Sequence, residues 1–349
     1  MTKFFSVLIC FLTLIGANAQ TESQRAFRDA LPDSRTNMSV ALEDGQGNKS
    51  MLPIVILKGA EPGPTFTWLA GVHGSEYAPI IATQQLLDEI DPGQLKGTLV
   101  ILPLLNDGAF YGREAYINPV DGVNLNNAFP GDANGSITQR IAHSVTENII
   151  PVSDFFLDIH CGDAPEDLLP FVCYYVDENR PQQTGLAKRL SDGSGFEYSV
   201  ACPFNIDYEE PAKYAFKQAA QDGKTALSIE SGRLGLVEKE AVDLVKTGVY
   251  NMLDLMGMYA EGSGPHPELK LLADQIYIDS TVQGIFYSDL KAGDRVLEGQ
   301  EVGYTTDAFG RRLETYHAPK AGTVLYMLAT PPINVEDTVM CISTKTLKN

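Results

Sequence analysis

The chain has 349 residues and a formal net charge of −19, with 44% hydrophobic and 20% charged residues. These proportions are ordinary for a folded globular protein and exclude a disordered or fibrous chain. The acidic balance, together with the lack of any Lys/Arg-rich run, argues against binding to nucleic acids or to anionic membranes.

The N-terminus has the pattern of a cleavable export signal. Lys3 supplies a short positive region, residues 4–15 form an apolar stretch, and Ala17-Asn18-Ala19 provides a small-x-small cleavage pattern. The apolar run is short for a membrane span, although an uncleaved anchor is the alternative. We therefore expect residues 1–19 to be a signal peptide and the mature protein to be periplasmic or secreted, without a membrane span.

The segment that follows, residues 20–265, alternates predicted strands and helices. This alternation favours a mixed, mainly parallel sheet flanked by helices. A long Gly/Asn/Pro-rich stretch at 106–135 interrupts it, and long irregular segments in compact domains usually carry function. The predicted strands are 39–42, 52–57, 65–70, 98–102, 154–159, 171–176 and 225–229, and the predicted helices are 77–90, 137–150, 180–191 and 238–259.

A second domain is predicted at 266–349, after the Gly/Pro-containing linker 261–267. Its sequence consists of short β-type runs between glycine turns. Two similar segments begin at Gly284 and Gly322, 38 positions apart. Two related β units of this length indicate a small quasi-symmetric barrel or sandwich, similar to lipoyl or biotinyl carrier domains. Lys320 lacks the sequence setting of a cofactor-carrying lysine. We therefore expect the C-terminal domain to have a structural or substrate-gating role.

The cysteines give no metal or disulfide pattern. Beyond Cys10 in the signal, Cys161, Cys173, Cys202 and Cys341 are widely spaced and include no CxxC pair. Cys161 follows His160, and we expect it to be a small buried residue rather than a nucleophile.

Metal-competent side chains stand where three predicted strands end. His73 and Glu76 form an HxxE pair after the first of these strands, His160 ends the second and Glu230 ends the third. In open α/β sheets ligands bind at the carboxyl ends of the strands. A hydrolytic zinc site needs three nitrogen or carboxylate ligands and a free position for water. The pattern therefore predicts a metal-dependent hydrolase.

The other three histidines have less specific settings. His143 lies in a predicted helix and is interpreted as a helix-face residue, and His266 lies in the linker. His317 is interpreted as structural, with lining of the substrate pocket as the alternative.

Four motifs in order carry a family resemblance. They are GVHGSE around His73 and Glu76, DGVNLNNAFPG at 121–131, DIH ending at His160, and SIESG around Glu230. Together they resemble the succinylglutamate desuccinylase/aspartoacylase family of the zinc carboxypeptidase-like superfamily. The resemblance covers roughly residues 71–232, and the C-terminal β domain is similar to one in many members.

The resemblance implies a role for each matching residue. His73, Glu76 and His160 match the ligands of a single zinc ion, and Glu230 matches the general base. Arg113 matches an arginine that polarises the scissile carbonyl, and it belongs to both the catalytic and the substrate-binding set.

One position departs from the family pattern. The usual Asn-Arg pair that grips a substrate carboxylate is Asn126-Asn127 in this chain. Asparagine cannot replace the charged, bidentate guanidinium. We therefore do not transfer a named substrate from the family.

The sequence thus predicts an exported, zinc-dependent amidohydrolase that cleaves an amide bond of a small N-acyl amino acid or a related compound. The alternatives are a carboxypeptidase-like enzyme acting on short, possibly cell-wall, peptides and a non-catalytic zinc- or small-molecule-binding protein.

Overall fold

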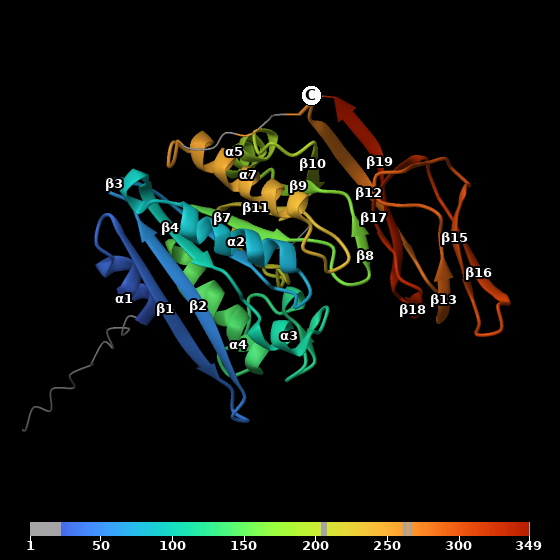
Figure 1. Ribbon diagram of the computed structural model, residues 1–349, viewed down its shortest axis with the longest axis horizontal. Helices are drawn as coiled ribbons and strands as arrows, with labels where there is room; N and C mark the ends of the chain where they lie inside the picture. The colour runs from blue at the N-terminus through green and yellow to red at the C-terminus, as the bar shows by residue number, and fades with distance from the viewer. Residues whose placement is uncertain (1–21, 204–207, 261–263, 265–266, 349) are drawn as a thin grey trace, which may run out of the picture.

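The computed structural model describes residues 22–203, 208–260, 264 and 267–348 (Figure 1). The predicted signal peptide therefore lies outside the described residues, as does His266. No helix in the described part of the chain has the length and apolarity needed to cross a membrane.

The helices are α1 (Glu22–Asp29), α2 (Tyr77–Glu89), α3 (Asp107–Gly112), α4 (Ile137–Ser144), α5 (Pro181–Asp192), α6 (Ala215–Gln221) and α7 (Lys239–Leu255). The strands up to the linker are β1 (Ser34–Glu43), β2 (Lys49–Lys58), β3 (Glu61–Ala70), β4 (Lys96–Leu102), β5 (Ile117–Asn118), β6 (Val123–Asn124), β7 (Phe155–His160), β8 (Glu166–Leu168), β9 (Phe171–Val176), β10 (Tyr198–Pro203) and β11 (Thr225–Glu230). Those after it are β12 (Lys270–Asp279), β13 (Gly284–Tyr287), β14 (Arg295–Val296), β15 (Glu301–Thr306), β16 (Arg312–His317), β17 (Gly322–Leu328), β18 (Pro332–Ile333) and β19 (Thr338–Lys348).

One large sheet organises the molecule. Its strand order is β1-β2-β4-β3-β7-β11-β9-β10-β12-β19-β17-β14, and β8 pairs with β17. The neighbours β4, β3, β7 and β11 at its centre run parallel, whereas β9 is antiparallel to β11. The predicted mixed α/β fold, with parallel strands at its centre, is confirmed.

Helices cover both faces of this sheet. Helices α2, α5 and α7 share one buried cluster, which includes Trp68 and Phe66 of β3. Helix α4 and helix α6 share a second cluster with β1 and β2 on the other face. Strands buried on both faces must be almost continuously apolar, which explains the sequences TFTWLA and FFLDI. The only polar groups such strands tolerate are those with a partner or a function.

Several elements differ from the sequence prediction. The helix expected at 137–150 is α-helical only to Ser144 and continues as a π-helical turn over Val145–Ile149. The helix expected at 238–259 ends at Leu255, because Gly257 takes a positive φ of 67°. Strand β10 and helix α6 were not predicted. They are short segments that depend on packing against the large sheet rather than on local propensity.

The C-terminal strands continue the large sheet and face a second one. Strand β12 pairs with β10, and the sheet of β16, β15, β13 and β18 encloses a separate apolar cluster with β14, β17 and β19. The predicted barrel-sandwich is therefore present (Figure 1).

The two repeat segments begin equivalent strands, β13 at Gly284 and β17 at Gly322. A Cβ at either glycine would lie 2.4 Å from a backbone oxygen of a neighbouring strand. The exact boundary at 265/266 stays a prediction, since those residues lie outside the described part.

Candidate metal centre

The loop after β3 places the first two predicted ligands. Gly71 turns the chain with a positive φ of 72°, and Glu76 precedes the first residue of α2. Between them, a Cβ at Gly74 would lie 2.3 Å from the carbonyl oxygen of Glu114 and 2.4 Å from that of Ala109. Only glycine allows the HxxE loop to pack this closely against α3 and the chain after it.

His73, Glu76 and His160 converge on one point. Oε1 of Glu76 lies 2.8 Å from Nδ1 of His73, and its Oε2 lies 3.0 Å from Nδ1 of His160. One donor atom from each of the three residues lies within 4.8 Å of the other two. Glu76 and His160 are only 2% and 4% exposed, so a pair of imidazoles and a carboxylate is held together out of solvent.

This donor set suits a single divalent cation. Zinc bonds of about 2.0–2.1 Å in a tetrahedral arrangement separate neighbouring ligand atoms by roughly 3.3 Å. The separations of 2.8 to 3.2 Å between Glu76 and the two histidines are close to that value, and the donor atoms of all three residues lie within 4.8 Å of one another. Two histidines and a glutamate are also a ligand combination of catalytic zinc sites. The residues present therefore fit a mononuclear metal centre.

Two further side chains lie close behind the histidines. The Asp158 carboxylate, fully buried on the same face of β7, lies 2.9 Å from Nε2 of His160 and leaves Nδ1 to face Glu76. Oδ1 of Asn124 lies 3.2 Å from Nε2 of His73. Carboxylates and amides behind a metal-binding histidine typically fix its ring orientation. Neither side chain was predicted from the sequence, although Asp158 in DIH and Asn124 in GVNLN lie inside two of the family motifs.

The charges within the group are strongly coupled. Burial opposes ionisation of Glu76, but the charges of His160 and His73 outweigh it and lower the pKa of Glu76 to about 2. Burial likewise opposes the imidazolium of His160, yet the carboxylates of Asp158 and Glu76 raise the pKa of His160 well above its ordinary value. Without a cation, the site therefore holds a proton where the metal would bind.

Glu230 ends β11 directly beside His160. The two residues are register partners in the parallel β11–β7 pair. Burial raises the pKa of Glu230 well above its ordinary value. The charge of His160 lowers this pKa by less than burial raises it, and the charge of Glu76 raises it further. A carboxyl group with a raised pKa beside a metal centre is suited to accept and return a proton.

The predicted substrate residues are exposed or half-buried. Arg113 follows α3 with a positive φ of 58° and an exposed side chain, which forms no hydrogen bond or ion pair within the described part of the chain. Asn127 is exposed, and Asn126 is half-buried with a buried Oδ1 that has no hydrogen-bond partner among the described residues. The roles of these three residues stay predictions.

The remaining sequence interpretations concern residues that are not in the ligand set. Cys161 is buried as expected, and burial raises its thiol pKa well above the ordinary value, so a nucleophilic thiolate is disfavoured. The four cysteines of the described part are free. His143 lies on α4, whereas His317 is exposed at the end of β16.

An α/β sheet with a His-Glu-His group and a glutamate at its carboxyl edge defines a class of proteins whose sheet edge can hold a single metal ion. The chain matches the succinylglutamate desuccinylase/aspartoacylase catalytic domain over residues 62–256, more than half of its length. It belongs to this family.

Similar proteins cover nearly the whole chain. A curated relative is the N-alpha-acetyl-L-2,4-diaminobutyric acid deacetylase of Halomonas elongata, which is 28% identical over 327 residues, or 90% of this chain and 92% of the relative.

Solved structures share the fold. The product-bound ectoine utilization protein EutE of Ruegeria pomeroyi has a TM-score of 0.79 at 23% identity, over 89% of this chain and 95% of that one. A succinylglutamate desuccinylase/aspartoacylase structure from Rhodobacter sphaeroides has a TM-score of 0.76 at 23% identity, over 91% and 97%.

Proposed function

We propose that the protein is an exported, zinc-dependent amidohydrolase that removes the acyl group from a small N-acylated amino acid or a related compound. The observation that carries the proposal is the convergence of His73, Glu76 and His160 with Glu230 beside them. The activity printed for the Halomonas relative, deacetylation of an acetylated amino acid, supports the reaction class.

His73, Glu76 and His160 would hold the ion through two imidazole nitrogens and a carboxylate. Zinc in such a site supplies a Lewis acid that polarises a carbonyl and lowers the pKa of a water molecule. Glu230 accepts the proton of the attacking water and later donates it to the leaving amine. Its raised pKa makes it able to carry that proton between the two steps.

Arg113 is the cation that we propose to face the negative charge on the carbonyl oxygen. It lies three residues before Tyr116, whose ring meets the His73 ring edge-on with centroids 5.8 Å apart. Asn126, with its unpartnered amide oxygen, and Asn127 would contact the bound substrate by neutral hydrogen bonds.

The test is a substrate screen with metal analysis. Purified protein loaded with zinc is assayed for amine release from N-acyl amino acids and from dipeptides. We expect one zinc per chain and turnover of N-acyl amino acids. Preferred turnover of dipeptides would replace the proposal with a peptidase, and stoichiometric zinc without turnover of either class would indicate a binding protein.

Export is tested separately. The mature protein recovered from cells of its source is expected to begin at Gln20, which N-terminal sequencing or intact mass would show. Recovery of the full chain with Met1 in the cytoplasmic fraction would contradict it.

A further inference from the structure

The hairpin between β15 and β16 presents an aromatic side chain to solvent. Phe309 stands at its tip and is 96% exposed, the highest value among the exposed large hydrophobic side chains of the described part. One apolar side chain in water is common on protein surfaces and by itself indicates nothing. Its meaning depends on the turn that holds it, on the charges beside it and on what the same molecule offers as a partner.

The turn that carries Phe309 is held rigidly. The Asp307 carboxylate accepts the backbone N–H groups of Phe309 at 2.9 Å and of Arg311 at 3.0 Å, and it accepts Nε of Arg311 at 3.1 Å. Gly310 takes the positive φ of 80° that the turn requires. The phenyl ring is therefore presented on a fixed backbone, which lowers the conformational entropy that a contact would cost.

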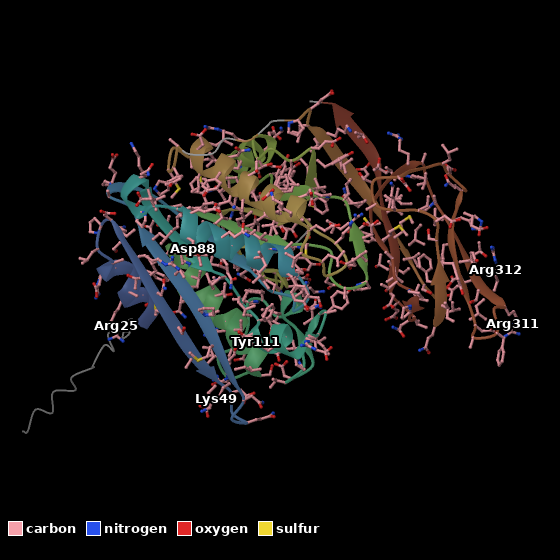
Figure 2. All side chains as sticks on the ribbon, viewed as in Figure 1. Arg25, Lys49, Asp88, Tyr111, Arg311 and Arg312 are labelled. Atoms are coloured by element: carbon pink, nitrogen blue, oxygen red, sulfur yellow. The ribbon has the colours of Figure 1, made fainter. Side chains whose placement is uncertain are left out.

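Two arginines stand next to this ring. Figure 2 shows Arg311 and Arg312 at the outer end of the C-terminal sandwich. Arg312 is ion-paired with Glu301 at 3.0 Å, whereas Arg311 uses only its Nε, so its two Nη groups form no hydrogen bond within the described residues. Aromatic and arginine side chains are enriched at protein interfaces. The tip therefore has the composition of a contact site.

A cavity of the same sandwich has the size and lining to receive such a ring. Its volume is about 540 Å³, and it reaches the core residues Phe286, Met327 and Leu328, with Tyr287 at its side. It is lined by the first residues of β15, whereas the tip follows the last one. Strand β15 has six residues and is about 20 Å long, so cavity and tip lie toward opposite ends of it.

The charge at this cavity is opposite to that of the tip. Asp289 lines it, and its exposed carboxylate forms no hydrogen bond or ion pair within the described part of the chain. A free carboxylate at the cavity and free Nη groups at the tip are complementary across a contact, and such pairs mainly fix its register. They also offset locally the repulsion between two chains that each carry a formal net charge of −19.

We propose that two copies of the chain associate through their C-terminal sandwiches, each inserting Phe309 into the cavity of the other. Arg311 of one copy then faces the partner's Asp289. Because tip and cavity lie toward opposite ends of one strand, an antiparallel pair of sandwiches makes both contacts at once. Such a twofold arrangement is closed and uses the same surface of both copies. The two contacts form a small interface, so we expect a weak dimer with a Kd on the order of micromolar.

Sedimentation equilibrium of the purified, zinc-loaded protein tests the dimer. Phe309→Ser should raise the Kd about thirtyfold or more, as loss of an interface hot spot does. Ala329→Trp, which fills the cavity from an exposed position in its lining, should have a similar effect. Leu31→Ser removes another apolar side chain that is 71% exposed, far along the chain, and is the matched control that should leave the Kd unchanged. The Tm of each variant shows that it is folded.

A cross-link shows which surfaces meet. Ala308→Cys at the tip and Ala329→Cys at the cavity are made in separate chains, mixed and treated with copper phenanthroline as the oxidant. A disulfide should form between unlike chains faster than between like ones, and Phe309→Ser in the first chain should slow it.

Three results would overturn the proposal. They are a wild type that stays monomeric at about 100 µM, well above the expected Kd, a dimer that survives Phe309→Ser, and cross-linking of unlike chains no faster than of like ones. A monomer that sediments with phosphatidylcholine/phosphatidylglycerol vesicles only when Phe309 is present would assign the tip to a membrane surface instead.

Discussion

Replacing Glu230 by glutamine separates the proposed base from the metal site. Glutamine has the same shape, and the β11–β7 backbone pairing that places it beside His160 is unchanged. General acid–base catalysis typically contributes about 10²–10⁴-fold, so kcat should fall by that factor, or about 3 to 5 kcal/mol of transition-state stabilisation. Zinc content should stay at one per chain, because the three ligands are intact.

The same substitution should not destabilise the fold. Burial and the charge of Glu76 raise the pKa of Glu230, which means that its charged form is disfavoured in the native state. A carboxyl group whose pKa is raised in the native state lowers the free energy of unfolding once the pH rises above its pKa in the unfolded chain. A neutral amide at the same position removes that cost. We therefore expect the Tm of the metal-free variant at pH 7 to equal or exceed that of the wild type.

The assay is amine release under saturating substrate, with zinc measured by atomic absorption and Tm by calorimetry. Glu178→Gln, on an exposed turn, controls for the loss of one negative charge. Turnover within threefold of the wild type in Glu230→Gln would remove Glu230 as the base. Loss of zinc together with activity would make it a ligand instead.

The remaining predictions concern the metal ligands and their supports. His160→Ala should lose both zinc and activity, and a variant that retains one zinc per chain would contradict the ligand assignment. Asp158→Asn should weaken zinc binding about tenfold to a hundredfold in a chelator competition, because it removes the carboxylate 2.9 Å from Nε2 of His160; unchanged affinity would refute this supporting role.

Zinc affinity should rise with pH between 6 and 8, because the raised pKa of His160 means that the ion must displace a proton. With one proton displaced the gain is about tenfold per pH unit, and a flat profile would show that His160 is already neutral.

The sequence was sufficient to predict the centre of the fold and the inner part of the site. His160 and Glu230 could be predicted because each ends a strand that is otherwise buried and apolar. A polar side chain is costly to bury in that setting unless it has a partner or a ligand. His73 and Glu76 could be found from their spacing and from the turn that precedes α2.

The outer part of the site could not be predicted in this way. Strand β8 follows a short turn after His160, and nothing local shows that it pairs with β17, about 160 positions further along. Strand β10 was missed for a similar reason, since its pairing with β9 and β12 comes from tertiary structure. Contacts between distant segments leave little trace in local periodicity.

The groups proposed for the reaction and the groups proposed for substrate specificity depend on different parts of the fold. The groups proposed for the chemistry stand at the ends of β7 and β11 and in the loop after β3, where the rigid centre of the sheet fixes them. Asn126 and Asn127, which are proposed to contact the substrate, lie outside these strands, in the short 3₁₀ turn Leu125–Asn127. Arg311 and Arg312 lie at the outer end of the C-terminal sandwich (Figure 2). A chain of this family with arginine in place of Asn127 should, on the same reasoning, favour an anionic substrate with the same metal chemistry.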